Sequence, residues 1–257
     1  MTSGAAELPP PELSIVLATF NERENLPRLL DRIRAVSLPP CEVLIVDDGS
    51  TDGTREYLES AARSDARLRP IWHEGKQTTL RAQCQGISDS RGRFIIIMDA
   101  DLQHPPEVLP AMVRALEDGA ALVVGSRYAP GGSAGPRTWI RAAISRGAEW
   151  TAKVVLPEAR AVSDPVSGLF GFRRAIFRPI PTDWRGYKLL LVLLVMGRGQ
   201  RVAEVGYPFE PRASGSSKVT ENSRFVRFFL MEVAHARRFR RILATLPSTV
   251  PEPGQRL

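Results

Sequence analysis

Cysteine, histidine and long apolar runs are scarce in this sequence, and each scarcity excludes a class of protein. Its 257 residues include two cysteines and three histidines. Two cysteines, Cys41 and Cys84, do not make a disulfide framework, and neither has a neighbouring Cys or His at the spacing of metal ligands. We expect both to be core or helix-face residues in a reducing compartment. The longest apolar run, 189–196, is far shorter than the roughly 20 residues that span a bilayer, so no integral membrane segment is expected.

The first residues are not expected to act as a secretory signal. Residues 1–12 are small, Pro-rich and without an apolar stretch, which predicts a disordered leader. The formal net charge is +7, from 35 basic and 28 acidic residues. Such an excess suits nucleic acid, anionic lipid or a phosphorylated substrate. No groove-reading motif or basic surface with interleaved aromatics occurs, so we expect no nucleic-acid partner.

Short apolar runs alternate with helical patterns along the first half of the chain. Strands are expected at 13–19, 42–46, 69–72, 94–98 and 121–124. Alternation with helices predicts βαβ units and an α/β fold: a Rossmann-like, mostly parallel sheet flanked by helices. We expect Asn25 to cap the helix after the first strand. Further on, we expect a helix at 137–156, a turn entering a strand at 163–172, an apolar helix opened by 186–188 and running to 196, and a strand at 201–207.

Acidic side chains follow three of these strands. Glu22 comes after the first strand, Asp47 and Asp48 end the second, and Asp99 and Asp101 end the fourth. An isolated Asp-x-Asp is more often a solvated turn that caps a helix. The carboxyl ends of parallel strands meet at one edge, however, where ligands bind.

Strand alternation would put Asp99 and Asp101 on one side of the chain. Hard oxygen ligands with open positions suit Mg²⁺ or Mn²⁺, which bring substrate phosphates with them. A cation and nucleotide site at this edge is therefore our expectation.

A series of short motifs occurs in order along the chain. They are Ala18–Asn25 (ATFNEREN), Val46–Thr54 (VDDGSTDGT), Met98–Glu107 (MDADLQHPPE), Gly125–Tyr128 (GSRY), Ser163–Gly168 (SDPVSG), Gly186–Lys188 (GYK) and Arg212–Lys218 (RASGSSK). Together they resemble the family 2 glycosyltransferases of GT-A fold. Within these, the chain is similar to the polyprenyl-phosphate (dolichol-phosphate) mannose or glucose synthases. Each motif alone is weak, but the ordered set is specific and covers about 13–218.

The resemblance implies an inverting, metal-dependent transfer of a hexose from a nucleotide sugar to a polyprenyl phosphate. GDP-mannose is the first expected donor and UDP-glucose the second. The implied nucleotide-binding residues are Thr19, Asn21, Glu22, Asp47, Asp48 and Asp99. The implied ligands of Mg²⁺ or Mn²⁺ are Asp99, Asp101 and Gln103, in agreement with the chemistry of these residues. The metal would neutralise charge on the departing diphosphate.

A phosphate clamp is implied as well. The expected catalytic set is Asp101, Arg127, Arg212 and Lys218. Its three basic members would hold the acceptor and donor phosphates, because guanidinium groups match phosphate geometry. Arg141 and Ser145 are candidates to assist. Asp164 either orients one of the arginines or caps its turn, and both interpretations stay open.

The sequence departs from the family pattern at two places. Family members often carry Gly-Leu-Gly where this chain has 76–80 (KQTTL). They also often carry an acidic residue after Gly-Tyr-Lys, where this chain has the apolar run 189–193. A phosphate monoester has a second pKa of about 6, so the acceptor needs little deprotonation. We expect the missing acid to alter orientation rather than to abolish transfer.

The C-terminal segment carries apolar and basic residues near helical spacing. We expect a GT-A domain over 13–220, a basic amphipathic helix over 221–243 and a flexible tail over 244–257. The apolar positions are Phe225, Phe228, Phe229, Val233 and Ala236. The helix either lies on an anionic membrane or packs on the domain with its arginines outward. The implied lipid acceptor favours a cytoplasmic protein held peripherally on the cytoplasmic membrane face, and an integral-membrane partner is compatible with this.

Two other functions remain open. One is a glycosyltransferase of the same fold that uses UDP-glucose or another donor with a non-lipid acceptor. The other is a catalytically inactive, nucleotide-binding GT-A domain. Asp99, Asp101 and Gln103 count against the second, because a non-catalytic domain has no need of a metal.

Overall fold

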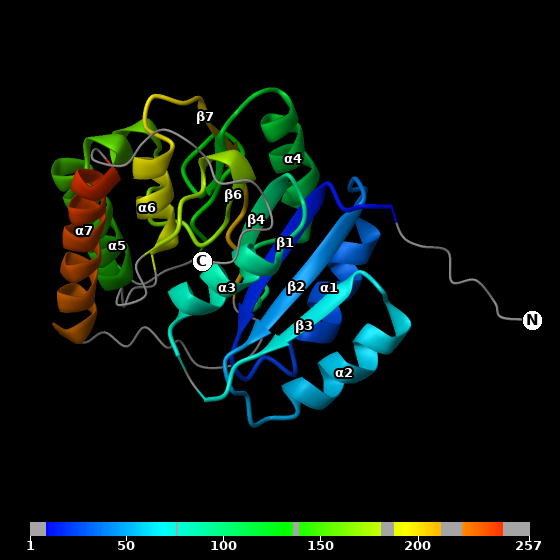
Figure 1. Cartoon of the computed structure of the whole chain (residues 1–257). Coiled ribbons are helices and arrows are strands. Elements are labelled where there is room, and N and C mark those ends of the chain that lie inside the picture. Colours follow the sequence, from blue (N-terminus) through cyan, green and yellow to red (C-terminus); the bar gives the residue numbers. More distant parts are fainter. Residues whose placement is uncertain (1–8, 76, 136–138, 181–187, 212–222, 244–257) are drawn as a thin grey trace, which may run out of the picture.

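The computed structural model describes residues 9–75, 77–135, 139–180, 188–211 and 223–243 (Figure 1). Its strands are β1 Leu13–Thr19, β2 Cys41–Asp47, β3 Leu68–Trp72, β4 Phe94–Asp99, β5 Leu122–Ser126, β6 Phe170–Arg173 and β7 Val202–Gly206. Its α-helices are α1 Leu26–Ala35, α2 Thr54–Ser64, α3 Thr79–Asp89, α4 Leu109–Glu117, α5 Trp139–Val155, α6 Leu189–Met196 and α7 Ser223–Leu243. The 3₁₀ turns are η1 Pro106–Val108, η2 Pro157–Ala161 and η3 Arg174–Ile176. These bounds agree with the strands and helices expected in the described residues.

The strands form one sheet of seven in the order β3-β2-β1-β4-β6-β5-β7. β6 runs antiparallel to β4 and β5, and the other neighbouring pairs are parallel. The expectation of a mostly parallel α/β sheet is therefore confirmed. Because β6 runs against its neighbours, the chain that enters it arrives at the carboxyl end of β4, where Phe170 pairs with Ile97.

Helices cover both faces of the sheet (Figure 1). One core layer joins residues of α3, α5, α6 and α7 to one side of the strands. The other joins α1, α2 and α4 to the opposite side. Alternate residues of β4 belong to different layers: Ile95 and Ile97 to the first, Phe94 and Ile96 to the second. Burial on both faces explains why β4 reads as a continuous apolar run.

The start of α1 differs from the expectation for Asn25. Asn25 is the N-cap residue, but its side chain makes no capping hydrogen bond, so that prediction is wrong. Its backbone is already helical, with φ −87° and ψ −34°, whereas a capping side chain needs extended backbone. The Asn25 amide instead donates to Glu22 Oε2 at 2.7 Å. The chain thus turns directly from Glu22 into the helix.

The apolar face of α7 packs on the domain. Phe229, Val233, Ala236 and Phe239 are at most 4% exposed and join the core layer that contains α6. Of the two arrangements considered for this helix, the structure has the packed one. The side chains of Phe225 and Phe228 lie outside the described residues. The leader 1–8 and the tail 244–257 do so too, so the expectations for these segments stay predictions.

Because α3 packs closely on the sheet at Gly86, a larger residue there should destabilise the protein. A Cβ at Gly86 would collide with Val16 Cγ1 and come 3.3 Å from Val46 Cγ2. We expect Gly86→Ala to lower the free energy of unfolding by about 1–3 kcal/mol through overpacking, measured by urea denaturation. Gly147→Ala in α5 is the matched control, since nothing lies within 4 Å of its Cβ position. It should be neutral or stabilising, because alanine favours a helix by about 1 kcal/mol over glycine. Equal stability of the two variants would contradict this account.

Candidate active site at the carboxyl edge of the sheet

The acidic motifs meet at the carboxyl ends of three adjacent strands. Thr19 pairs with Asp47 between β1 and β2, and Ala18 pairs with Asp99 between β1 and β4. After β1 the chain continues to β2 on one side, while β4 lies on the other. This is the topological switch point at which open α/β sheets bind ligands. The convergence expected from the sequence is present.

The turns after β1 and β2 hold each other. Asn21, with φ +57°, donates its N–H to Ser50 Oγ at 2.8 Å. Its Oδ1 accepts from the Thr51 N–H at 2.9 Å. Asp47 accepts from the N–H of Ser50 at 3.1 Å and also from its hydroxyl. Glu22 donates its N–H to Thr54 Oγ1 at 3.1 Å. Mutual bonding of this kind makes one rigid wall of the two turns.

Asp48 and Thr19 are buried residues at the start of these two turns. Asp48 is 7% exposed, and its Oδ1 accepts from the Gln77 N–H at 2.9 Å and lies 3.2 Å from His73 Nδ1. Asp48 therefore holds the backbone of Gln77, which belongs to the stretch that departs from the family pattern. Thr19 is buried and donates its hydroxyl to the Val46 carbonyl at 3.2 Å.

The turn after β4 carries the expected metal ligands. The side chain of Asp99 is 44% exposed, whereas Asp101 is buried. Asp101 Oδ1 accepts from the Gln103 N–H at 3.1 Å, and Leu102 between them has φ +64°. β4 ends at Asp99, so strand alternation does not extend to Asp101, and the direction of Asp101 is set by the turn. The Gln103 amide donates to the Glu210 carbonyl at 3.5 Å.

The donor set fits a hard divalent cation. The described part of the chain contains no cluster of three or more His, Cys, Asp or Glu residues that could hold a metal ion. The expected set is smaller: two carboxylates and an amide oxygen. Mg²⁺ and Mn²⁺ are often held by one or two carboxylates with substrate phosphates and water completing the shell. The half-exposed carboxylate of Asp99, beside Asp101 in the same turn, meets this requirement.

Arg127 is locked in a buried ion pair. Its Nε and Nη2 donate to the two oxygens of Asp164 at 2.6 and 2.7 Å, and its backbone N–H donates to Oδ2 at 3.3 Å. Asp164 is fully buried, and the side chain of Arg127 is 12% exposed. Burial lowers the pKa of the Arg127 guanidinium, but the hydrogen bond and charge of Asp164 outweigh it and raise that pKa. Asp164 therefore orients Arg127, the first of the two interpretations.

A polar network surrounds this pair. Glu149 Oε1 accepts from the Tyr128 hydroxyl at 2.6 Å and from Ser145 Oγ at 3.1 Å, and lies 3.7 Å from Arg127 Nη2. The rings of Tyr128 and Phe209 lie 5.4 and 5.7 Å from the Arg127 guanidinium carbon. Arg212, Lys218 and the side chain of Arg141 lie outside the described residues.

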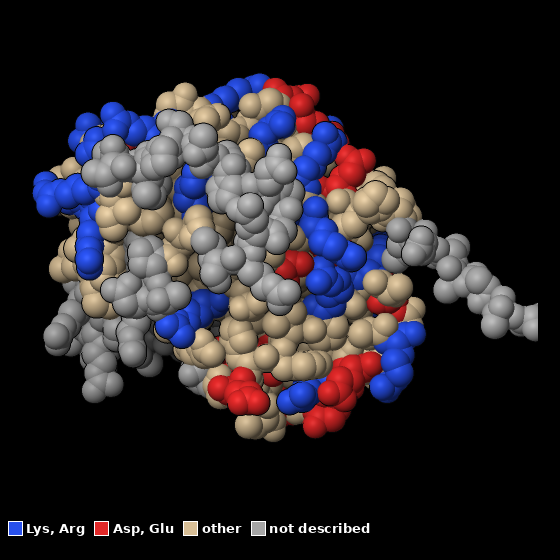
Figure 2. All heavy atoms as spheres, viewed as in Figure 1, with Lys and Arg blue, Asp and Glu red and all other residues tan. Residues whose placement is uncertain are grey.

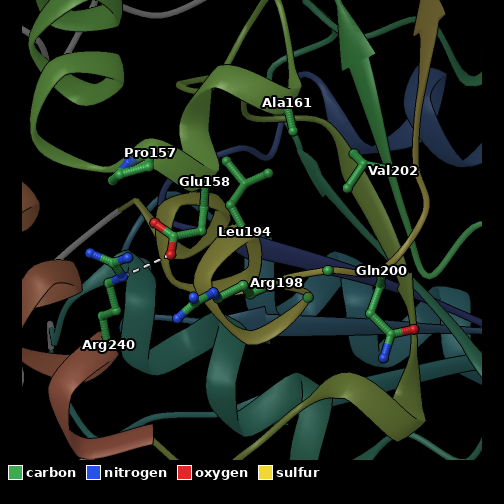
Figure 3. Close-up of a pocket in the computed structure, with 10 residues that line it drawn as sticks. Pro157, Glu158, Ala161, Leu194, Arg198, Gln200, Val202 and Arg240 are labelled. Atoms are coloured by element: carbon green, nitrogen blue, oxygen red, sulfur yellow. Dashed lines mark ion pairs between the residues drawn. The ribbon is translucent and has the colours of Figure 1, made fainter. Parts of the chain in front are cut away.

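A separate cavity of about 300 Å³ lies between α6, η2, β7 and α7. Figure 3 shows Glu158 and Arg240 facing each other there, with Arg198 beside them. Arg240 Nε donates to Glu158 Oε1 across 2.8 Å, which fastens α7 to η2. Val202, at the start of β7, lines the cavity. The cavity is therefore at the sheet edge opposite Asp99 and is no part of the candidate site.

Comparison with known proteins identifies the family. A model described as Glycosyl transferase family 2 matches residues 14–180. The chain belongs to this family. A dolichol-phosphate mannosyltransferase of Pyrococcus furiosus is 35% identical over 209 residues, covering 81% of this chain and 59% of that protein. One from Mycosarcoma maydis is 32% identical over 252 residues, 93% of this chain and 83% of that protein. The chain thus spans less than two thirds of the P. furiosus relative.

Solved structures share the fold of this family 2 enzyme. Glucosyl-3-phosphoglycerate synthase from Mycobacterium tuberculosis, in complex with UDP, superposes with a TM-score of 0.66 at 20% identity, over 89% of this chain and 80% of that chain. The same enzyme with Mn²⁺ and UDP-glucose gives a TM-score of 0.66 at 19% identity, with the same coverage. These matches confirm the α/β fold expected for the family.

Two site residues of this glycosyltransferase were not among the sequence-based expectations. Glu149 was missed, although Ser145 and Glu149 stand four residues apart on α5, a spacing that brings side chains together on a helix. His104 was also missed, although it directly follows Gln103 in the segment that carries the expected metal ligands. Its imidazole is 3% exposed and lies 3.4 Å from the Asp99 carboxylate.

The Arg127–Asp164 pair generates a second stability prediction. Asp164→Asn removes the charge that is hydrogen-bonded to the buried guanidinium and leaves it the longer contact with Glu149, 3.7 Å from Nη2. We therefore expect it to lower the free energy of unfolding by about 3–5 kcal/mol in urea denaturation. Removing both charges, with Arg127→Met and Asp164→Leu together, should regain much of that loss. Glu59→Gln breaks an exposed ion pair with Arg55 and should change stability by about 0.5 kcal/mol or less. A loss for Asp164→Asn as small as that of Glu59→Gln would refute a stabilising role for the buried pair.

Proposed function

We propose that this family 2 glycosyltransferase moves a hexose, with inversion, from a nucleotide sugar to a polyprenyl phosphate. An oxygen of the acceptor phosphate attacks the anomeric carbon, the bond from that carbon to the diphosphate breaks, and the nucleoside diphosphate leaves. The observation that carries the proposal is the turn after β4, which gathers Asp99, Asp101 and Gln103 at the switch point of the sheet. A divalent cation bound there would neutralise the departing diphosphate.

GDP-mannose is the first proposed donor. Relatives that are 32–35% identical carry the name dolichol-phosphate mannosyltransferase or polyprenol monophosphomannose synthase. UDP-glucose is second, because the solved structure that holds it is 19% identical and shares the fold alone. A non-lipid acceptor and an inactive nucleotide-binding domain remain the alternatives.

Each part of the site has a proposed task. The wall formed by Thr19, Asn21, Glu22, Asp47 and Asp48 binds the nucleoside. Arg127, with Arg212 and Lys218, binds phosphate oxygens of donor and acceptor. Because Asp164 already holds the Arg127 guanidinium in place, little ordering remains to be done when a phosphate arrives.

A transfer assay tests the reaction. Purified full-length protein, Mn²⁺ or Mg²⁺ and a short polyprenyl phosphate are incubated with radiolabelled GDP-mannose or UDP-glucose. We expect label in the organic phase, its loss when EDTA removes the metal, and a drop of at least about 100-fold in Asp101→Ala. Asp118→Asn, an exposed carboxylate at the end of α4, is the matched control and should keep full activity.

The outcomes of this assay separate the alternatives. Transfer of either sugar to the organic phase names the donor. Metal-dependent binding of a nucleoside diphosphate without any lipid product would favour a non-lipid acceptor or an inactive domain.

We also propose peripheral attachment to an anionic membrane, at its cytoplasmic face. No helix in the described residues is both long and apolar enough to cross a bilayer. A short exposed apolar stripe nevertheless lies on α5, where Trp150, 68% exposed, and Val154, 51% exposed, stand four residues apart on one face. Tryptophan on a protein surface beside aliphatic side chains is suited to the membrane interface. The stripe replaces the buried face of α7 as the proposed contact with lipid.

Basic side chains complement this stripe. Arg237, Arg238 and Arg241 of α7 are exposed. Figure 2 shows basic side chains along the side of the molecule that carries α7, and acidic side chains gathered over α2. Each basic side chain near an anionic surface contributes about 1 kcal/mol of attraction. The α7 end of the molecule is therefore the end that we propose faces lipid.

Co-sedimentation with phosphatidylserine-containing vesicles tests the attachment. Trp150→Ser should weaken vesicle binding about 10–100-fold, because a buried large apolar side chain contributes roughly 1.5–3 kcal/mol and each 1.4 kcal/mol is a factor of about ten. Arg237→Gln with Arg238→Gln should weaken it further and reduce its salt dependence. Arg63→Gln, which removes an exposed charge from α2, is the control and should bind as the unaltered protein does. Unchanged binding of Trp150→Ser would remove α5 from the contact.

A further inference from the structure

His104 is buried beside the carboxylate that the proposed function gives to the metal. Its ring is 3% exposed, and Nε2 lies 3.4 Å from Asp99 Oδ2. Nδ1 is buried as well and has no hydrogen-bond partner among the described residues. A neutral imidazole carries one N–H. With that hydrogen on Nε2, the ring donates to Asp99 and buries only a lone pair at Nδ1.

Two aromatic rings fix the plane of the imidazole. The ring of Tyr207 lies 5.3 Å and that of Phe209 5.6 Å from the His104 ring, centroid to centroid. Both come from the residues directly after β7, far from His104 in the sequence. The ring is therefore held by tertiary packing and not by its own turn.

Gly168 covers the contact between His104 and Asp99. A Cβ at position 168 would come 2.5 Å from Asp99 Oδ2 and 3.0 Å from His104 Nε2. Only a residue without a side chain fits there unless Asp99 moves. The same segment carries Asp164, the partner of Arg127. Residues 164–168 thus contact both Asp99, the carboxylate proposed to bind the metal, and Arg127, the guanidinium proposed to bind phosphate.

We propose that His104 is a positioning residue: by donating Nε2–H to Asp99 Oδ2 under the cover of Gly168, it fixes the carboxylate that receives the divalent cation. The inference rests on the metal role of Asp99 in the proposed function. Hydrogen-bond partners of metal ligands orient them, and losing such a partner typically costs about 10–100-fold in metal affinity. His104 itself touches neither the metal nor the substrate in this account.

Binding of Mn²⁺ tests the role without relying on turnover. Free Mn²⁺ is measured by electron paramagnetic resonance while MnCl₂ is titrated into full-length protein with saturating GDP or UDP. His104→Phe keeps an aromatic ring between Tyr207 and Phe209 but removes the donor, and should weaken Mn²⁺ binding about 10–100-fold. His104→Gln is the matched variant, because its amide nitrogen can donate to Asp99. It should bind Mn²⁺ within about threefold of the unaltered protein.

Gly168→Ala provides an independent test from the other side of the carboxylate. Its Cβ forces Asp99 Oδ2 to shift, so Mn²⁺ affinity should fall as in His104→Phe. Gly147→Ala, at an open position in α5, should leave the affinity unchanged. The urea midpoint of every variant is recorded as well. If His104 had a purely structural role, its substitution would lower this midpoint, but His104→Phe and His104→Gln would not differ in Mn²⁺ affinity.

The possible failures are distinguishable. If the unaltered protein binds no Mn²⁺ with either nucleoside diphosphate, the metal assignment of the proposed function is wrong and the role of His104 falls with it. If the unaltered protein binds Mn²⁺ and His104→Phe binds it equally well, the metal assignment stands and only the positioning role is overturned.

Discussion

The antiparallel pairing of β6 with β4 is the constraint on which the candidate site depends. In a wholly parallel sheet, every strand is entered from the edge opposite the ligand site. Because Phe170 pairs with Ile97, the chain enters β6 at the carboxyl end of β4. The segment before β6 therefore lies over the turn of Asp99. This reversed strand brings Gly168 against Asp99 and Asp164 against Arg127.

The same reversal determines how charge is distributed around the site. Asp164 is fully buried, and a buried carboxylate is costly unless it is paired and hydrogen-bonded. Its partner Arg127 follows β5, which is parallel to β4 and therefore ends at the same edge. The two charges meet because one precedes a strand and the other follows one. Their pairing keeps the guanidinium charged and holds it in one orientation.

How far the sequence predicts this site depends on how local each interaction is. Asp47, Asp48 and Asp99 could be placed at one sheet edge, because strand order in βαβ units and apolar runs are readable locally. The partner of Asp164 could not be chosen, because the choice depends on the direction of β6, a four-residue strand with no local signal of direction. Strand alternation does not reach Asp101 for a related reason. The left-handed backbone at Leu102 belongs to the turn, which periodicity does not describe.

The packing of α7 could not be predicted either, because it depends on tertiary contacts. It also bears on one departure from the family pattern, the apolar run at 189–193. A helix that is apolar on all sides must be covered on all sides. α6 is such a helix: Leu189 to Val195 are at most 4% exposed, and the buried face of α7 lies in the same core layer. An acidic residue within 189–193 would sit in that layer without solvent. The absence of an acidic residue in 189–193 is thus consistent with the packing of α7 in the same core layer as α6. The proposed reaction tolerates it, because an acceptor phosphate with a second pKa of about 6 is largely ionised before it binds.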